Sequence, residues 1–508
     1  MIAQKVTFAF VNRLFINALG FVSLFFVAHY MGPETVGIIS FALAYVGIFQ
    51  NFSDFGFGSA HIKRVSEGKD FGKCNGTYFF VKTVLTVVFA VVVLATIFIT
   101  KCVQQSSFIS REHEIVLYIV LLSAVIGNLS MIFIITFGAR KEIAKQQIPL
   151  LAEKIVAVTG KVIVALVGLG VIFLAGATLV SSIIALACFI WLFRDYPIKR
   201  PDKGYFKSYV TFALPVMFIG FLSNIAYNLD KVMIQFFGTT TDVGYYSAAQ
   251  RISLVLVFIT TASTTLIFPT ISTYYSENRI GAIRSLTKQA ERYLSMVFFP
   301  AVAFILTFSR HICLILLGTE FIASAPILAI LAFVALINGT TQPYTQQMGG
   351  TNRIMLAAKL SSIVFGLNIL LNILFIPQQF LGIKLFGMGG IGAALATLIS
   401  MSIGALLFRY YAYRITASKP YTRTFLHLVS AVFMSIVLYY ISASMYAVPV
   451  HYLMLFALLG IVIYVLTLAA LREFSAKDLH FFIKILNPVQ LKKYAVNEIK
   501  SGFVQNLH

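Results

Sequence analysis

Long apolar stretches recur along this 508-residue chain and decide what it can fold into. The hydrocarbon core of a bilayer, about 30 Å thick, needs about 20 apolar residues of α-helix to cross it. Fourteen stretches of this kind follow one another. Only 11% of the residues are charged, far fewer than the surface of a soluble chain requires. The sequence therefore predicts an all-α, polytopic membrane protein.

Short polar or glycine-containing turns separate the predicted spans. The least distinct turn, between the fifth and the sixth span, rests on Gly168-Leu169-Gly170. The fourteen spans are predicted at residues 8–30, 38–57, 78–100, 115–137, 149–169, 173–193, 211–237, 244–268, 289–308, 325–347, 354–376, 388–408, 424–446 and 450–471.

The basic residues predict the orientation of the chain. Of 39 Lys and Arg residues, 28 lie in the termini and in the loops after even-numbered spans, whereas the opposite loops carry only Lys101, Arg111, Arg310 and Lys384. Cytoplasmic loops are enriched in Lys and Arg, so we predict that both termini are cytoplasmic. A net charge of +21 would suggest nucleic acid in a soluble chain, but this bias accounts for most of it, and no nucleic-acid partner is expected.

A hairpin motif occurs twice. Residues 31–42 close the first span and open the second, and residues 238–249 do the same for the seventh and eighth spans, 207 residues later. An even number of spans separates the copies, so they have the same orientation, as in transporters built from two parallel halves. The alternative is chance similarity between two apolar hairpins.

The repeat and the loop composition predict five segments. A basic stretch with two prolines, which reads as a linker, joins the halves, and the tail mixes apolar residues with Lys as interfacial helices do. A disordered, solvated tail is the alternative. The segments are a six-helix lobe at 1–193, a cytoplasmic linker at 194–210, a second six-helix lobe at 211–408, two additional spans at 409–471 and a cytoplasmic amphipathic tail at 472–508.

Charges inside spans mark the candidate site, because each costs at least about 2.5–3.5 kcal/mol at the bilayer centre and usually faces protein or water. Lys161 lies about 18 Å along the fifth span at 1.5 Å per residue. Lys154 is seven residues earlier, on nearly the same face. We expect both to line a polar cavity. The alternatives are pairing with Glu153 or another acid and, for Lys154, snorkelling to the inner surface.

Polar residues at helical spacing extend this pattern to other spans. In the first span Arg13 and Asn17 share a face, and snorkelling is again the alternative for Arg13. In the seventh span Asn224, Tyr227 and Lys231 share a face. Asp230 of the seventh span and Arg251 of the eighth could instead form a structural ion pair across the turn between these spans. Lys82, at the start of the third span, is expected to lie at the membrane interface.

With Lys359 set aside as an expected interfacial residue, the cations within the predicted spans exceed the acids by six to three, which suits an anionic cargo. Arg offers a bidentate fork to phosphate and Lys a point charge, whereas amide and aromatic side chains suit sugars. The anionic-headgroup candidates are Arg13, Lys154, Lys161, Lys231 and Arg251; the weaker glycan candidates are Asn17, Asn51, Asn224, Tyr227, Asn228 and Gln250; and the candidate ion-coupling acids are Asp54, Glu153 and Asp230.

The sequence carries no enzyme signature. The longest outer loop, at about 101–114, is too short for a catalytic domain, and the phosphate-binding motif G-x-x-x-x-G-K-[ST] is absent. The four cysteines have no metal-ligand spacing. We therefore expect no enzymatic activity, no cofactor and no metal.

Four motifs, in this order along the chain, resemble the oligosaccharide–lipid flippases of the MOP exporter superfamily, the Wzx-type polysaccharide transporters. Each motif alone is weakly specific, but together they reach from the first to the twelfth span. They are Gly-Pro-Glu-Thr-Val-Gly at 32–37; Phe212-Ala213-Leu214-Pro215 with Asn228-Leu229-Asp230-Lys231 and the hairpin at 242–249; Leu317-Gly318-Thr319-Glu320-Phe321 with Ala325-Pro326; and Asn368 and Asn372 with Ile376-Pro377 and Gly389-Gly390-Ile391-Gly392-Ala393-Ala394.

The resemblance implies a MATE-like fold of two six-helix lobes plus two C-terminal helices, with a central cavity that opens to each side in turn. It implies a substrate in which a surface-polysaccharide unit, such as an O-antigen repeat, is carried on polyprenyl pyrophosphate and is moved across the prokaryotic plasma (inner) membrane. Membrane lipids and the polymerase and glycosyltransferases of the same pathway are the implied partners.

Two other functions stay open. A drug or cation antiporter of the related MATE group would favour an acidic cavity, which the excess of cations disfavours. A non-catalytic scaffold of a polysaccharide assembly complex would tolerate the removal of charges from the cavity.

Overall fold

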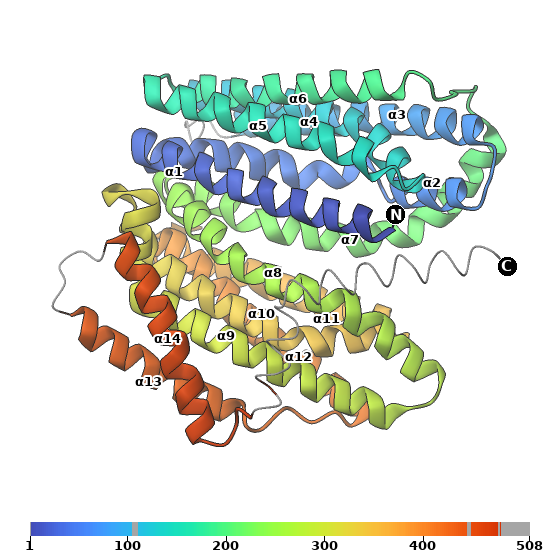
Figure 1. Cartoon of the computed structure of the whole chain (residues 1–508). Coiled ribbons are helices and arrows are strands. Elements are labelled where there is room, and N and C mark those ends of the chain that lie inside the picture. The colour runs from blue at the N-terminus through green and yellow to red at the C-terminus, as the bar shows by residue number, and fades with distance from the viewer. Residues whose placement is uncertain (1, 104–109, 444–448, 476–477, 479–508) are drawn as a thin grey trace. The chain divides into compact units, whose positions relative to one another are not determined.

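The computed structural model describes residues 2–103, 110–443, 449–475 and 478, and the side chains of these residues except 2–10, 103, 214–223, 258–259 and 261–266. Long α-helices make up almost all of the described chain, which confirms the predicted all-α fold (Figure 1). The chain divides into two compact units between Phe236 and Phe237. The predicted amphipathic tail lies almost wholly outside the described residues.

The first unit contains seven α-helices and one short 3-10 helix among the described residues. Its elements are α1 (Ile2–Ile48), the 3-10 helix η1 (Phe49–Ser53), α2 (Phe57–Ser66), α3 (Phe71–Val103), α4 (Arg111–Ala139), α5 (Ile143–Val167), α6 (Val171–Phe193) and α7 (Lys203–Phe237), of which the last residue opens the second unit.

The second unit consists of helices with one small antiparallel hairpin. Its elements are α8 (Thr240–Ser276), α9 (Ile280–Leu317), η2 (Thr319–Phe321), α10 (Ser324–Gly350), α11 (Ile354–Phe375), β1 (Gln379–Phe380), β2 (Ile383–Lys384), α12 (Gly389–Thr416), α13 (Thr424–Ser442) and α14 (Val450–Ala470).

Turn residues divide the helices where the sequence predicted. Helix α1 breaks at Gly32, whose φ of 74° suits glycine, and Pro33 follows without an amide hydrogen. Gly168, with φ 75°, ends α5 and separates it from α6. Helix α8 instead begins with a capping box between Thr239 and Asp242. Both copies of the repeated hairpin thus turn the chain, but by different local chemistry.

Ten described helices are long and apolar enough to cross a membrane, and the first of these runs through both limbs of α1. Helix α5 is not among them, because Glu153, Lys154 and Lys161 make it more highly charged. The helices are consistent with fourteen spans, and that number stays a prediction.

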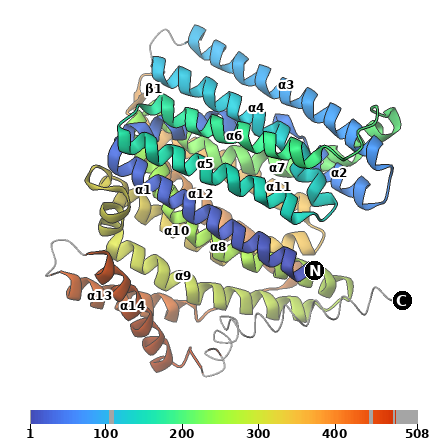
Figure 2. The same ribbon diagram turned by 45° about the horizontal axis from the view of Figure 1, so that its top comes forward.

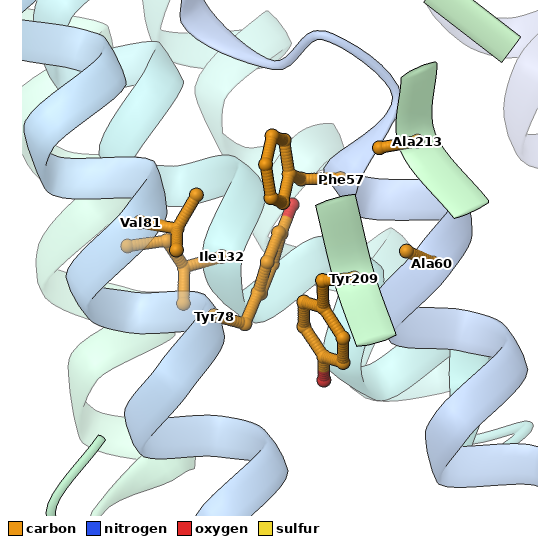
Figure 3. Packing of buried hydrophobic residues seen from close by; sticks show 7 residues of the cluster. All are labelled: Phe57, Ala60, Tyr78, Val81, Ile132, Tyr209 and Ala213. Atoms are coloured by element: carbon orange, nitrogen blue, oxygen red, sulfur yellow. The ribbon is translucent and has the colours of Figure 1, made fainter. Parts of the chain in front are cut away.

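Packing at one end of the first unit brings four helices together. Figure 3 shows Phe57 of α2, Tyr78 of α3, Ile132 of α4 and Tyr209 of α7 converging in one cluster of buried side chains. Buried His61 of α2 connects this cluster by hydrogen bonds, its Nδ1 lying 3.0 Å from the Tyr209 hydroxyl. The short helix α2, which the sequence did not predict, is therefore built into the core.

The two helices predicted to lie outside the repeat pack within the second unit. Helix α13 packs against α9, and α14 packs against both, as Figure 2 shows for the adjacent ribbons. The rings of Phe308 and Phe456 stack with centroids 5.5 Å apart, and Gly460 lies close to Leu438. The contact-based division places α7 with the first unit, whereas the sequence repeat assigns it to the second half. The five predicted segments stay a prediction.

Gly76 of α3 provides a test of the packing in the first unit. A Cβ at this position would lie 1.7 Å from the backbone oxygen of Lys199, so Gly76→Ala must push the chain apart. We expect a loss of about 2–3 kcal/mol or more, as overpacking typically produces, seen as a lower melting temperature in detergent. The matched control is Gly127→Ala in α4, where a Cβ meets nothing within 4 Å and helix propensity favours Ala. Equal melting temperatures for the two variants would contradict the close approach of Gly76 to the Lys199 backbone.

Candidate substrate site

Helix α7 brings four of the predicted site residues together in the first unit. The Asn224 side-chain amide donates to the Gly47 carbonyl of α1 at 3.1 Å, and the Asn228 amide donates to the Asn224 side-chain oxygen, also at 3.1 Å. A Cβ on Gly47 would lie 3.0 Å from the Asn228 amide nitrogen. Glycine at this position therefore allows the two helices to approach each other.

Lys231 adds a cation one turn further along α7. Its Nζ lies 4.5 Å from the centroid of the Tyr227 ring, within the range of a cation–π contact. Lys231 is 7% exposed, whereas Tyr227 is 47% exposed. The adjacent Asp230 is buried. The exposed Tyr227 ring can contact a sugar ring, whereas the Lys231 ammonium, as the structure stands, offers little surface to an anion.

Helices α1 and α5 carry three further predicted cations in the same unit. The Asn12 amide donates to the Gln147 side-chain oxygen at 2.8 Å and holds α1 against α5. Arg13, next to Asn12, is exposed, whereas Lys154 and Lys161 of α5 are half-buried. Helices α1 and α5 thus pack against each other, and the three cations that they carry are here called the α1–α5 basic region.

Two of the predicted polar side chains have local partners. The Asn17 amide donates to the Arg13 carbonyl at 2.7 Å, one turn earlier in the same helix. Glu153 accepts a hydrogen bond of 3.4 Å from the Ser182 hydroxyl of α6. Asn51, in η1, is half-buried. Each of these groups is therefore held by its own unit, and the roles proposed for them stay predictions.

The remaining predicted residues belong to the second unit. Arg251 of α8 is exposed and makes no hydrogen bond or ion pair with any residue that the structure describes, and Gln250 is half-buried. Asp230 and Arg251 fall in different compact units, so the bridge between them stays a prediction.

Lys82 corrects one expectation from the sequence. This residue is not interfacial: it is 2% exposed, and its Nζ donates to the Ser53 carbonyl at 2.7 Å and lies 3.7 Å from an Asp54 carboxylate oxygen. The reason is that α3 begins at Phe71, seven residues before the predicted span, so Lys82 lies three turns inside the helix. Its charge partner, Asp54, is one of the candidate ion-coupling acids, and that role stays a prediction.

The Lys82 ammonium stabilises a break in the backbone. After η1 the chain turns through Phe55 and Gly56, with φ of 45° and 83°, before α2 begins. These turns interrupt the helical hydrogen bonds, and Lys82 satisfies the Ser53 carbonyl there. The Ser53 hydroxyl also donates to the Asn128 side-chain oxygen of α4 at 2.9 Å. Lys82 is therefore a structural cation.

A buried carboxylate in the second unit was absent from the balance of charges drawn from the sequence. Glu291 of α9 is 2% exposed, and its carboxylate lies 3.1 Å from Arg409 of α12. It also accepts hydrogen bonds from the Tyr344 hydroxyl and the Tyr421 backbone amide. Its position inside the predicted span 289–308 is the signal that could have identified it.

The next residue of α9, Arg292, holds the chain that follows α14. Its guanidinium forms ion pairs of 2.8 Å with Glu473 and with Asp478. Burial opposes ionisation of Asp478, but hydrogen bonds from Arg292 and Ser475 outweigh it and lower the pKa of this carboxyl group to about 2. Both acids are thus charged partners of Arg292 at neutral pH.

A comparison with known families now becomes decisive. The model of the family described as polysaccharide biosynthesis protein matches residues 2–275, which is more than half of the chain. The chain belongs to this family. The resemblance to MOP-superfamily polysaccharide transporters that was inferred from the motifs is therefore confirmed.

Two curated relatives come from Haloferax volcanii. The probable low-salt glycan biosynthesis flippase Agl15 is 22% identical over 405 residues, which cover 79% of this chain and 81% of the relative. The probable flippase AglR is 27% identical over 190 residues, which cover 37% of this chain and 38% of the relative.

Solved structures support the MOP fold. An inward closed conformation of the lipid II flippase MurJ has a TM-score of 0.72 at 17% identity, with 91% of this chain and 98% of the other covered. An inward-facing multidrug resistance MATE transporter of the MOP superfamily has a TM-score of 0.64 at 16% identity, with 80% and 99% covered. The predicted MATE-like fold is therefore confirmed, and the fold alone does not separate a flippase from a drug antiporter.

A buried lysine and an exposed lysine of the first unit, each paired with an aspartate, allow a test of stability. Lys82→Met leaves the buried Ser53 carbonyl without its donor, whereas the Asp54 carboxylate, which is 38% exposed, can turn to solvent, so we expect a loss of about 1–3 kcal/mol in unfolding free energy. Lys73→Met removes an exposed pair, Lys73–Asp202, and should cost less than about 1 kcal/mol. Thermal unfolding in detergent measures both. Similar losses in the two variants would show that Lys82 is not the buried structural cation described above.

Proposed function

We propose that this protein is a flippase that carries an oligosaccharide linked to polyprenyl pyrophosphate across the plasma membrane by alternating access. The observation that carries the proposal is the balance of charge within the predicted spans. Once the structural pairs Lys82–Asp54 and Arg409–Glu291 are set aside, the site candidates predicted from the sequence number five cations and two acids, Glu153 and Asp230. Such an excess favours an anionic cargo.

The chemistry of the site residues fits the two parts of this substrate. In the α1–α5 basic region Arg13 would offer a two-pronged donor to a phosphate, and Lys154 and Lys161 would offer point charges. On α7 the exposed Tyr227 ring would contact the ring face of a sugar, and Asn224 and Asn228, which hold α7 against α1, would contact sugar hydroxyls only if they released their present partners. The prenyl chain would stay among the lipid acyl chains.

The transport cycle would load the substrate from the cytoplasmic side, where the basic loops predict both termini to lie. A gradient of ions or the membrane potential would bias it. Of the candidate coupling acids, Asp54 would have to release Lys82 before it could bind an ion, whereas Glu153 holds the Ser182 hydroxyl and lies near the charge of Lys154. Of these two acids, Glu153 is therefore the better candidate. The cargo would come from glycosyltransferases and pass to a polymerase of the same pathway.

A drug antiporter is the second candidate, because a MATE transporter shares the fold. Its cationic substrates would be repelled by the same five cations, so the flippase is favoured. The drug susceptibility of a deletion strain separates the two: unchanged susceptibility with loss of surface polysaccharide supports the flippase, and increased susceptibility with normal polysaccharide supports the antiporter.

Lys161→Ala tests the proposed cation site. Since a charge-assisted hydrogen bond contributes about 1.5–3 kcal/mol, we expect export to fall roughly tenfold or more, with lipid-linked glycan accumulating in the inner leaflet. Lys161→Arg should retain most of the export. The amount of surface polysaccharide reports export. Periodate oxidation of intact cells, which reaches only sugars on the outer side, reports how much of the lipid-linked glycan has crossed the membrane.

The matched control is Lys359→Ala, which removes an exposed lysine near the start of α11. It should export normally. Normal export by a well-folded Lys161→Ala variant would remove Lys161 from the mechanism, and normal export after neutralising all five predicted cations would favour the scaffold instead.

A further inference from the structure

The hairpin between α11 and α12 exposes a row of apolar side chains. Strands β1 and β2 pair antiparallel, with Phe380 opposite Ile383, so Leu381 and Gly382 form the two-residue turn. Leu381 is 85% exposed and Ile383 is 65% exposed. Phe386, just after β2, is 60% exposed. We call Leu381, Ile383 and Phe386 the apolar tip.

The turn itself is unusual for a hairpin that faces water. Both turn residues have positive φ, 50° at Leu381 and 81° at Gly382. Turns of this kind strongly prefer Asn or Asp before the Gly, because a branched apolar side chain is sterically disfavoured at positive φ. Leu381 therefore bears a steric cost in a position where its side chain contacts little of the protein. An apolar environment for this side chain would offset that cost.

The base of the hairpin is firmly packed, so the apolar tip has a defined position. The Phe380 ring lies edge-on to Phe237, with centroids 5.6 Å apart, and the Phe386 ring lies edge-on to Phe375 at 5.3 Å. Backbone hydrogen bonds continue below the strands, including one of 2.8 Å from the Gly387 amide to the Pro377 carbonyl.

The position of the hairpin in the chain places it at a membrane boundary. It joins the end of α11 to the start of α12, and both helices are apolar and long enough to cross a bilayer. Lys384 of β2 is exposed and forms no ion pair with the residues described in the structure. An apolar tip beside a lysine matches the two layers of a leaflet, acyl chains and phosphate headgroups.

We propose that the apolar tip inserts among the acyl chains of the adjacent lipid leaflet, with Lys384 at the headgroup phosphates. The occupant of this surface is bilayer lipid, because the exposed groups pair an apolar tip with a cation at the end of two spans. The insertion would fix the depth of α11 and α12 in the membrane. It does not depend on which substrate is transported.

Tryptophan fluorescence in vesicles tests the insertion. The chain has a single tryptophan, so Trp191→Phe gives a silent background into which Leu381→Trp is introduced. The full-length variant is reconstituted in phosphatidylcholine–phosphatidylglycerol vesicles with or without brominated acyl chains. We expect strong quenching by the brominated lipid, a blue-shifted emission and little quenching by iodide. Ile383→Trp, which leaves the turn residues intact, should behave in the same way.

Glu112→Trp in the same background is the control, since this residue is exposed in the first turn of α4 and should be quenched by iodide rather than by bromine. Iodide quenching of Leu381→Trp and Ile383→Trp equal to that of the control would place the apolar tip in water and overturn the proposal. Protection from both quenchers would show that protein covers it, a second copy or a partner, and would overturn the proposal as well.

Discussion

The cost of an unpartnered polar group inside a bilayer organises both units of this protein. Where a helix breaks inside the first unit, at residues 54–56, the backbone loses hydrogen bonds that lipid cannot replace. Lys82 reaches that break from α3, and Asp54 balances its charge. In the second unit the buried charge is an anion. The Glu291 carboxylate forms an ion pair with Arg409 and accepts hydrogen bonds from the Tyr344 hydroxyl and the Tyr421 backbone amide. Both sites join helices that are distant in sequence.

The same constraint sorts the in-span charges into two classes. Lys82 and Glu291 are almost completely buried, and their partners account for them as parts of the fold. Arg13, Lys154 and Lys161 keep part of their surface, although each lies within a predicted span. A charge that stays partly accessible at membrane depth needs water or a charged ligand beside it. The substrate role that we propose for the α1–α5 basic region rests on this difference, whereas Lys231, at 7% exposed, belongs by burial with Lys82 and Glu291.

Hydropathy was enough to predict the long helices, because a bilayer imposes one length and one composition on every span. Glycine and proline placed the turns at Gly32 and Gly168 correctly, since backbone conformation there depends on local residues. Helix α2 and the β1–β2 hairpin were missed, because neither has the length of a span. The prediction for Lys82 was wrong because hydropathy identifies only the apolar part of α3, and the helix begins seven residues before that part. The Lys231–Tyr227 contact followed from helical spacing, whereas the partners of Asn224 and Lys82 depend on packing between helices.

In the proposed alternating access, the site opens first to one side of the membrane and then to the other. Each unit must keep its internal packing during this change. The polar contacts within the units meet this requirement. Ser53 and Lys82 tie the break after η1 to α3, and Asn128 adds α4, so this corner cannot bend without leaving buried polar groups unpaired. Arg292 likewise fixes the chain after α14 to α9. Because removing one partner of such a pair costs several kcal/mol, deformation inside a unit is disfavoured relative to motion of the unit as a body.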